Sequence, residues 1–89
     1  MIRKKLTIIN RLGLHARAAA KFVNVASRFK SDIQVVKNDK SVNGKSIMGV
    51  MMLAAAKGAG IELIATGDDE ETAISNLEEL INDRFGEGE

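Results

Sequence analysis

The chain has 89 residues, 45% of them apolar and 28% charged, which is typical of one small globular domain over residues 1–89. The absence of cysteine excludes disulfides, thiol catalysis and cysteine-ligated zinc, and the single histidine excludes any site that needs two imidazoles. The formal charge is only +1 and three Phe are the only aromatic residues, so we expect no nucleic-acid partner.

The first half of the chain predicts a strand, a helix and a hairpin. Apolar and polar residues alternate over 2–9, which indicates a half-buried strand, and a loop containing Gly13 follows. Apolar residues recur at helical spacing over 16–29. Two further strands, at 33–37 and 40–43, are separated by a two-residue turn, so we expect them to pair antiparallel, with the second at the sheet edge.

The second half predicts a helix, a strand and a last helix. Ser46 is a plausible N-cap for an apolar helix over 46–56, which the glycine-containing segment 57–60 would end. Alternation over 61–66 indicates a strand. The last helix, over 69–85, has an acidic first turn, which the helix dipole favours.

The order β-α-β-β-α-β-α predicts an α+β fold. We expect an open-faced β-sandwich, in which three helices pack on one face of a four-stranded antiparallel sheet.

The only histidine, His15, lies where the loop meets the first predicted helix. The unpaired amides and the positive dipole of a helix start attract anions, and Arg17 could add a charge-assisted contact. The same surroundings disfavour a charged ring, so we expect a neutral, nucleophilic imidazole. The residues alone leave open a second interpretation, in which His15 only caps the helix.

Two segments carry a resemblance to a known family. The segment from Gly13 to Ala19 reads Gly-Leu-His-Ala-Arg-Ala-Ala and resembles the active-site signature of the HPr family. These are the histidine-containing phosphocarriers of the bacterial phosphoenolpyruvate-dependent phosphotransferase system. The segment from Lys45 to Met51 resembles the regulatory-serine segment of the same family, and the order of elements matches along nearly the whole chain.

The resemblance implies a phosphoryl relay. Enzyme I would phosphorylate His15 on Nδ1, giving the pros-phosphohistidine, with Arg17 assisting, and an A component of an enzyme II would accept the group. The chain would then be a carrier rather than an independent catalyst, and it would need no cofactor and no metal.

One position departs from the signature, because Ala18 stands where the family usually has Pro. Ala is an excellent helix former, so we expect the helix start to survive. The departure leaves open a nitrogen-type regulatory carrier, or a signalling protein that acts mainly through protein binding, rather than a sugar-uptake carrier.

By the same resemblance, Ser46 would be phosphorylated by HPr kinase/phosphorylase. A phosphate there would repel an acidic partner and block the relay. The alternative is that Ser46 is only an N-cap.

The second predicted helix is apolar nearly all round, so Ile47, Met48 and Met52 could form an exposed partner-binding patch, with Lys21 beside it. The alternatives are core packing for the apolar residues and, for the neighbouring basic residues Arg28 and Lys45, a solvated basic face. No apolar segment suits a signal peptide or a membrane span, so we expect a cytoplasmic monomer with no membrane insertion.

Overall fold

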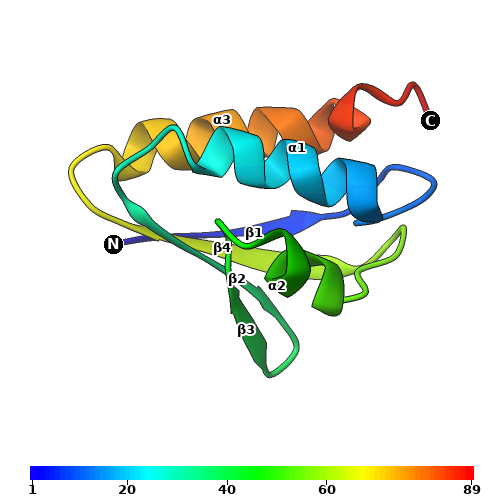
Figure 1. The fold of residues 1–89 in the computed structure, drawn as a ribbon, viewed down its shortest axis with the longest axis horizontal. Coiled ribbons are helices and arrows are strands. Elements are labelled where there is room, and N and C mark those ends of the chain that lie inside the picture. Colours follow the sequence, from blue (N-terminus) through cyan, green and yellow to red (C-terminus); the bar gives the residue numbers. More distant parts are fainter.

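The predicted fold class is confirmed. The computed structural model describes all 89 residues as a four-stranded antiparallel sheet with three α-helices and one short 3-10 helix (Figure 1). The elements in chain order are β1 (Ile2–Thr7), α1 (Ala16–Ala26), β2 (Asp32–Lys37), β3 (Lys40–Asn43), α2 (Ile47–Met52), β4 (Gly60–Thr66), α3 (Glu70–Asn82) and η1 (Arg84–Gly86).

The strands lie in the order β1-β4-β2-β3, and every neighbouring pair is antiparallel. Ala65 of β4 is opposite Ile2 on one side and Ile33 on the other, which places β4 in the sheet interior. The predicted hairpin of β2 and β3 is present, and Asn38 in its turn has a φ of 56°, a left-handed conformation that Asn tolerates well. β3 is an edge strand, as predicted.

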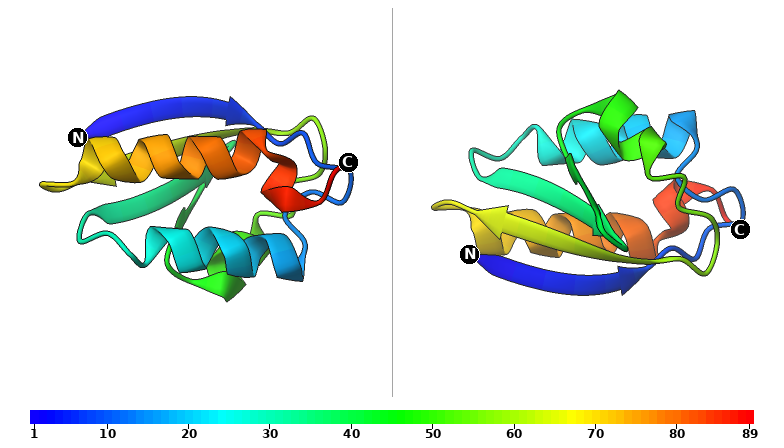
Figure 2. Two further views of the ribbon diagram at one scale, coloured as in Figure 1. Left: turned by 90° about the horizontal axis from the view of Figure 1, so that it is seen from above. Right: turned by 90° about the horizontal axis from the view of Figure 1, so that it is seen from below.

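The core lies between the sheet and the helices. Figures 1 and 2 show α1 and α3 side by side over one face of the sheet, with α2 beside α1. Alternate strand residues point into this core, and they meet apolar residues from the helices. The largest fully buried side chains include Phe22, Ile33, Leu63, Leu77 and Phe85. None of the helices combines the length and the apolar composition that crossing a bilayer requires.

The prediction of a helix over 46–56 is wrong in its extent, because α2 ends at Met52. Ala54 adopts a φ of 51°, which turns the chain out of the helix. Lys37 Nζ donates to the carbonyl of Leu53 at 3.1 Å, and the Leu14 amide donates to the carbonyl of Ala55 at 2.9 Å. Carbonyls after α2 therefore bond to other parts of the chain, and these tertiary contacts override a favourable local propensity.

Three other elements end earlier than the sequence predicted. β1 ends at Thr7 because Ile8 leaves the β1–β4 register and instead bonds through its main chain to residues 58 and 59. α1 ends at Ala26 in a tighter turn, in which Phe29 donates to the carbonyl of Ala26. α3 ends at Asn82, short of the predicted 85.

Candidate functional site

His15 is the N-cap residue of α1, with an extended backbone (φ −73°, ψ 177°). Its side chain makes no capping hydrogen bond to the helix. The first amides of an α-helix have no acceptor within the helix, so the start of α1 presents donors beside the imidazole. The helix begins at Ala16 even though Ala18 stands where the family usually has Pro. The predicted helix start is therefore confirmed.

The loop that carries His15 is fixed against the segment after α2. Gly13 has a φ of 66°, and a Cβ at this position would lie 2.4 Å from the carbonyl oxygen of Ala55. The Leu14 side chain is buried, and the Asn10 side-chain amide donates to the carbonyl of Gly13 at 2.8 Å. Only glycine fits such a close approach in this conformation, so the signature's glycine sets the position of the next residues.

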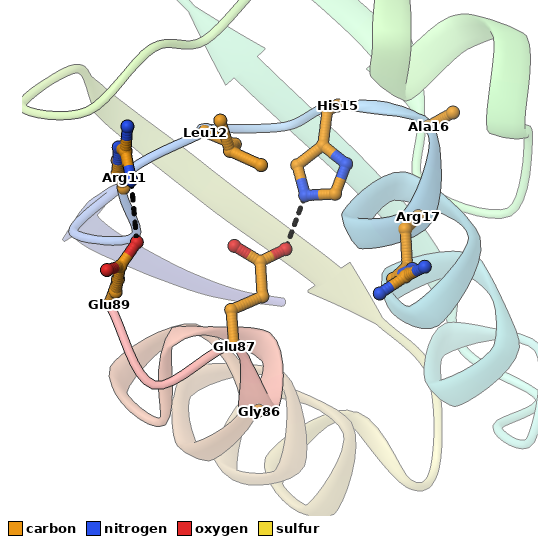
Figure 3. Close-up of a pocket in the computed structure, with 8 residues that line it drawn as sticks. All are labelled: Arg11, Leu12, His15, Ala16, Arg17, Gly86, Glu87 and Glu89. Atoms are coloured by element: carbon orange, nitrogen blue, oxygen red, sulfur yellow. Dashed lines mark hydrogen bonds and ion pairs between the residues drawn. The ribbon is translucent and has the colours of Figure 1, made fainter.

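The imidazole of His15 is paired with a carboxylate from the end of the chain. Glu87 Oε2 contacts His15 Nε2, and the other carboxylate oxygen, Oε1, accepts from Asn10 Nδ2 at 3.0 Å. Nδ1 has no hydrogen-bond partner within the chain, and Figure 3 shows it on the side of the ring that faces the start of α1. The two ring nitrogens therefore have different environments.

The short helix η1 brings Glu87 to this place. Arg84 and Phe85 have φ values of 56° and 54°, an unfavourable left-handed conformation for such residues. The buried ring of Phe85 and a 2.6 Å hydrogen bond from Lys21 Nζ to the Phe85 carbonyl hold this turn. The chain then reverses and runs back towards the His15 loop.

The surroundings of Glu87 favour its charged form. Burial alone would raise the pKa of this carboxyl group. The hydrogen bonds from Asn10 and His15, with the charge of Lys21, outweigh burial, and the pKa of Glu87 lies below its usual value. An ionised carboxylate thus faces the ring at neutral pH, in addition to the positive helix start that the sequence predicted.

A shallow, open pocket of about 660 Å³ surrounds this pair (Figure 3). Glu89 Oε2 pairs with Arg11 Nη1 at 3.0 Å on one side, whereas the exposed guanidinium of Arg17 has no carboxylate partner. Arg17 lies on α1, across the pocket from Glu87. An anion bound near Nδ1 could therefore contact the first amides of α1 and also the Arg17 guanidinium, which has no carboxylate partner. No three histidine or carboxylate side chains are grouped to hold a metal ion.

Ser46 lies at the start of α2 and is its N-cap. Its Oγ accepts a hydrogen bond from the Gly49 amide at 3.1 Å, so the predicted cap is confirmed. The apolar residues of α2 divide as expected between core and surface, because Val50 is buried while Met48 and Met52 are 72% and 69% exposed. Ile47 and Met51 are also exposed, at 44% and 39%.

Two residues of the site were not predicted from the sequence, namely Asn10 and Glu87. No local signal identified Glu87, because Phe85, whose burial holds the preceding turn, was predicted as the last residue of the final helix. Lys21, predicted as a partner-binding residue, is half-buried, and its ammonium group bonds within the molecule.

Comparison with known proteins agrees with the fold. A family model described as the PTS HPr component phosphorylation site matches residues 2–83. The chain belongs to the HPr family. The phosphocarrier protein HPr of Neisseria meningitidis serogroup A is 61% identical to this chain over 89 residues, which cover the whole length of both chains. The phosphocarrier protein HPr of Pseudomonas aeruginosa is 58% identical over 86 residues, 96% of each chain.

Solved HPr structures match as well. The crystal structure of HPr-C-His from Thermoanaerobacter tengcongensis aligns with a TM-score of 0.95 at 52% identity, over 98% of each chain. The structure of an HPr dimer from the same organism aligns with a TM-score of 0.79 at 52% identity, covering 98% of this chain and all of that one. Membership of the HPr family supports a phosphocarrier function in the phosphotransferase system.

Proposed function

We propose that His15 is the phosphoryl-carrying residue and that the phosphoryl group is held on Nδ1. The observation that carries this proposal is the asymmetry of the ring: Nε2 contacts Glu87, whereas Nδ1 is unpartnered and faces the start of α1. A nucleophilic nitrogen needs a free lone pair, and the developing phosphoryl charge needs donors beside it. Nδ1 has both.

Two kinds of donor would stabilise the phosphoryl group. The amides of the first turn of α1 point out of the helix start, and the helix dipole is positive there. The Arg17 guanidinium is exposed and free of ion pairs, so it can form charge-assisted hydrogen bonds to the phosphoryl oxygens. The helix amides are fixed by α1 before the group arrives, which lowers the cost of transfer, and the exposed Arg17 side chain can turn towards it.

An open site suits a carrier because donor and acceptor must both reach the same atom. We propose that enzyme I is the donor and that A components of enzymes II are the acceptors, as the sequence resemblance implies. The side chain of His15 is only 27% exposed, yet it lines a shallow pocket that is open to solvent. A nitrogen-type regulatory carrier would use the same chemistry with a different acceptor.

The experiment is phosphorylation of the purified chain by enzyme I and phosphoenolpyruvate, followed by intact-mass spectrometry. We expect one phosphoryl group that is labile in acid and stable in base. His15→Ala should gain none. Equal labelling of wild type and His15→Ala would refute the proposal.

We propose in addition that phosphorylation of Ser46 by HPr kinase/phosphorylase regulates the relay. Ser46 begins a helix whose neighbouring residues Ile47 and Met48 are exposed. A phosphate would add nearly two negative charges beside this apolar surface and would oppose the docking of an acidic partner.

We propose that Ile47, Met48 and Met52 form the docking surface for these partners. Two contacts support its closeness to His15: the Leu14 amide bonds to Ala55, shortly after α2, and Gly13 packs on the same segment. Flexible Met side chains can adapt to several partners. We propose Lys21 as a further partner-contacting residue, within the limits set by its bond to the Phe85 carbonyl. We expect the chain to act as a monomer in the cytoplasm, and light scattering in solution tests the first point.

A further inference from the structure

The contact between His15 and Glu87 has a consequence for the position of the ring proton. A neutral imidazole carries one proton, and the hydrogen bond made by one nitrogen decides which of the two holds it. A carboxylate can only accept, so a ring that bonds through Nε2 to Glu87 keeps its proton there. We propose that Glu87 is a positioning residue that fixes the tautomer of His15 and leaves the Nδ1 lone pair free. This inference rests on the function proposed above.

Glu87 is itself held in place on both sides. Asn10 is fully buried, and its amide nitrogen lies 3.0 Å from Glu87 Oε1 and 2.8 Å from the Gly13 carbonyl, so it ties the carboxylate to the His15 loop. The side chain of Glu87 is only 14% exposed. The two carboxylate oxygens thus have separate partners, Asn10 for Oε1 and His15 for Oε2. This arrangement holds the carboxylate in one orientation relative to the ring.

With the proton fixed on Nε2, the charges stay balanced while the phosphoryl group is transferred. The Nδ1 lone pair forms the new bond to phosphorus, while the bond from phosphorus to the phosphorylated donor breaks and its electron pair leaves with the donor. No proton leaves the ring, so His15 becomes cationic with its proton still on Nε2. Glu87 neutralises this charge. When the group moves on to an acceptor, the imidazole leaves as a neutral ring.

The test uses the unphosphorylated, 15N-labelled protein at a pH where the ring is neutral. Long-range 1H–15N correlation spectra show which nitrogen of His15 carries the proton. We expect Nε2 in the wild type and a change of about tenfold in the tautomer ratio, towards Nδ1–H, in Glu87→Ala. Glu87→Gln keeps an acceptor oxygen and should restore most of the preference. Glu89→Ala is the matched control, because that carboxylate lies in the same pocket but contacts Arg11.

The backbone amide spectrum of the same samples reports whether each variant is folded. A wild-type ring protonated on Nδ1, or a tautomer ratio in Glu87→Ala equal to that of the wild type, would overturn the inference. Because the measurement needs no phosphorylation, the two proposals can fail separately. A wild type with the predicted tautomer that enzyme I cannot phosphorylate would refute the proposed function alone.

Discussion

Gly13 and the carbonyl of Ala55 approach so closely that no side chain fits between them: a Cβ on Gly13 would lie 2.4 Å from that oxygen. The clashing atoms belong to the backbone, so a side-chain rotation cannot relieve them. The left-handed φ of 66° adds a further cost for any residue with a Cβ. We expect Gly13→Ala to lower the free energy of unfolding by more than about 1 kcal/mol and to displace the His15 loop. Urea denaturation measures the first effect.

Gly58→Ala is the control for this variant. Gly58 also has a left-handed φ, of 91°, but a Cβ there would meet nothing within 4 Å. The Gly58→Ala variant therefore measures the cost of the left-handed conformation without the clash. If both variants lose the same stability, the close contact with Ala55 is not what requires glycine at position 13.

Ser46 combines a structural role with a proposed regulatory one, and two variants separate them. Ser46→Ala removes the acceptor for the Gly49 amide and should cost about 1 kcal/mol in unfolding free energy, whereas Ser46→Asn keeps a cap. Ser46→Asp also keeps a cap but adds a negative charge, so we expect slower phosphorylation of His15 by enzyme I than in Ser46→Asn. Equal rates in the Asp and Asn variants would contradict regulation by charge at this position.

Asp69 makes stability depend on pH. The hydrogen bond from the Ser31 hydroxyl and those from the amides of Lys30 and Ser31 outweigh desolvation and hold the pKa of Asp69 below 3.8, its ordinary value. The carboxylate thus contributes stability above pH 3.8 that is lost as the pH falls through its lower folded-state pKa. Urea unfolding between about pH 5 and pH 2 should show this loss, and Asp69→Asn should reduce it.

Asp68→Asn serves as the control for this pH dependence, because the exposed Asp68 makes no side-chain hydrogen bond. We expect its stability to fall with pH as the wild type does. An Asp69→Asn variant with an unchanged profile would show that the contact with Ser31 does not contribute to acid sensitivity.

Arg17 should matter for transfer and not for stability. Its guanidinium is exposed and pairs with no carboxylate, so Arg17→Ala should leave the unfolding free energy nearly unchanged. Loss of a charge-assisted contact to the phosphoryl group should slow transfer from enzyme I by roughly tenfold. Arg28→Ala, an exposed arginine beyond the other end of α1, should transfer at the wild-type rate. Quenched-flow phosphorylation assays distinguish the two variants.

Much of the fold was predictable because the hydrophobic pattern is strong. The alternation of Ile61, Leu63 and Ala65 identified the interior strand, and the helical spacing of Ala19, Phe22 and Ala26 identified the buried face of α1. The end of α2 was not predictable, since the residues around Ala55 have good helix propensity. Only contacts with Leu14 and Lys37, distant in sequence, draw their carbonyls out of the helix.

The site shows the same contrast between local sequence patterns and contacts that are distant in sequence. His15, Arg17 and Ser46 lie in local motifs, and local sequence was enough to suggest them. Glu87 lies 72 positions from His15, and its arrival depends on a left-handed turn at Arg84 and Phe85. No local pattern encodes that turn, because it is stabilised by burial of Phe85 and by the distant Lys21.

Locating the phosphoryl group on the ring tests the proposed role of His15 most directly. The 15N-labelled chain would be phosphorylated by enzyme I and phosphoenolpyruvate, and 15N–31P couplings measured for His15. We expect a direct coupling from phosphorus to Nδ1, with a proton retained on Nε2. A phosphoryl group on Nε2, which Glu87 occupies in this structure, or no phosphoryl group on His15 at all, would contradict this expectation.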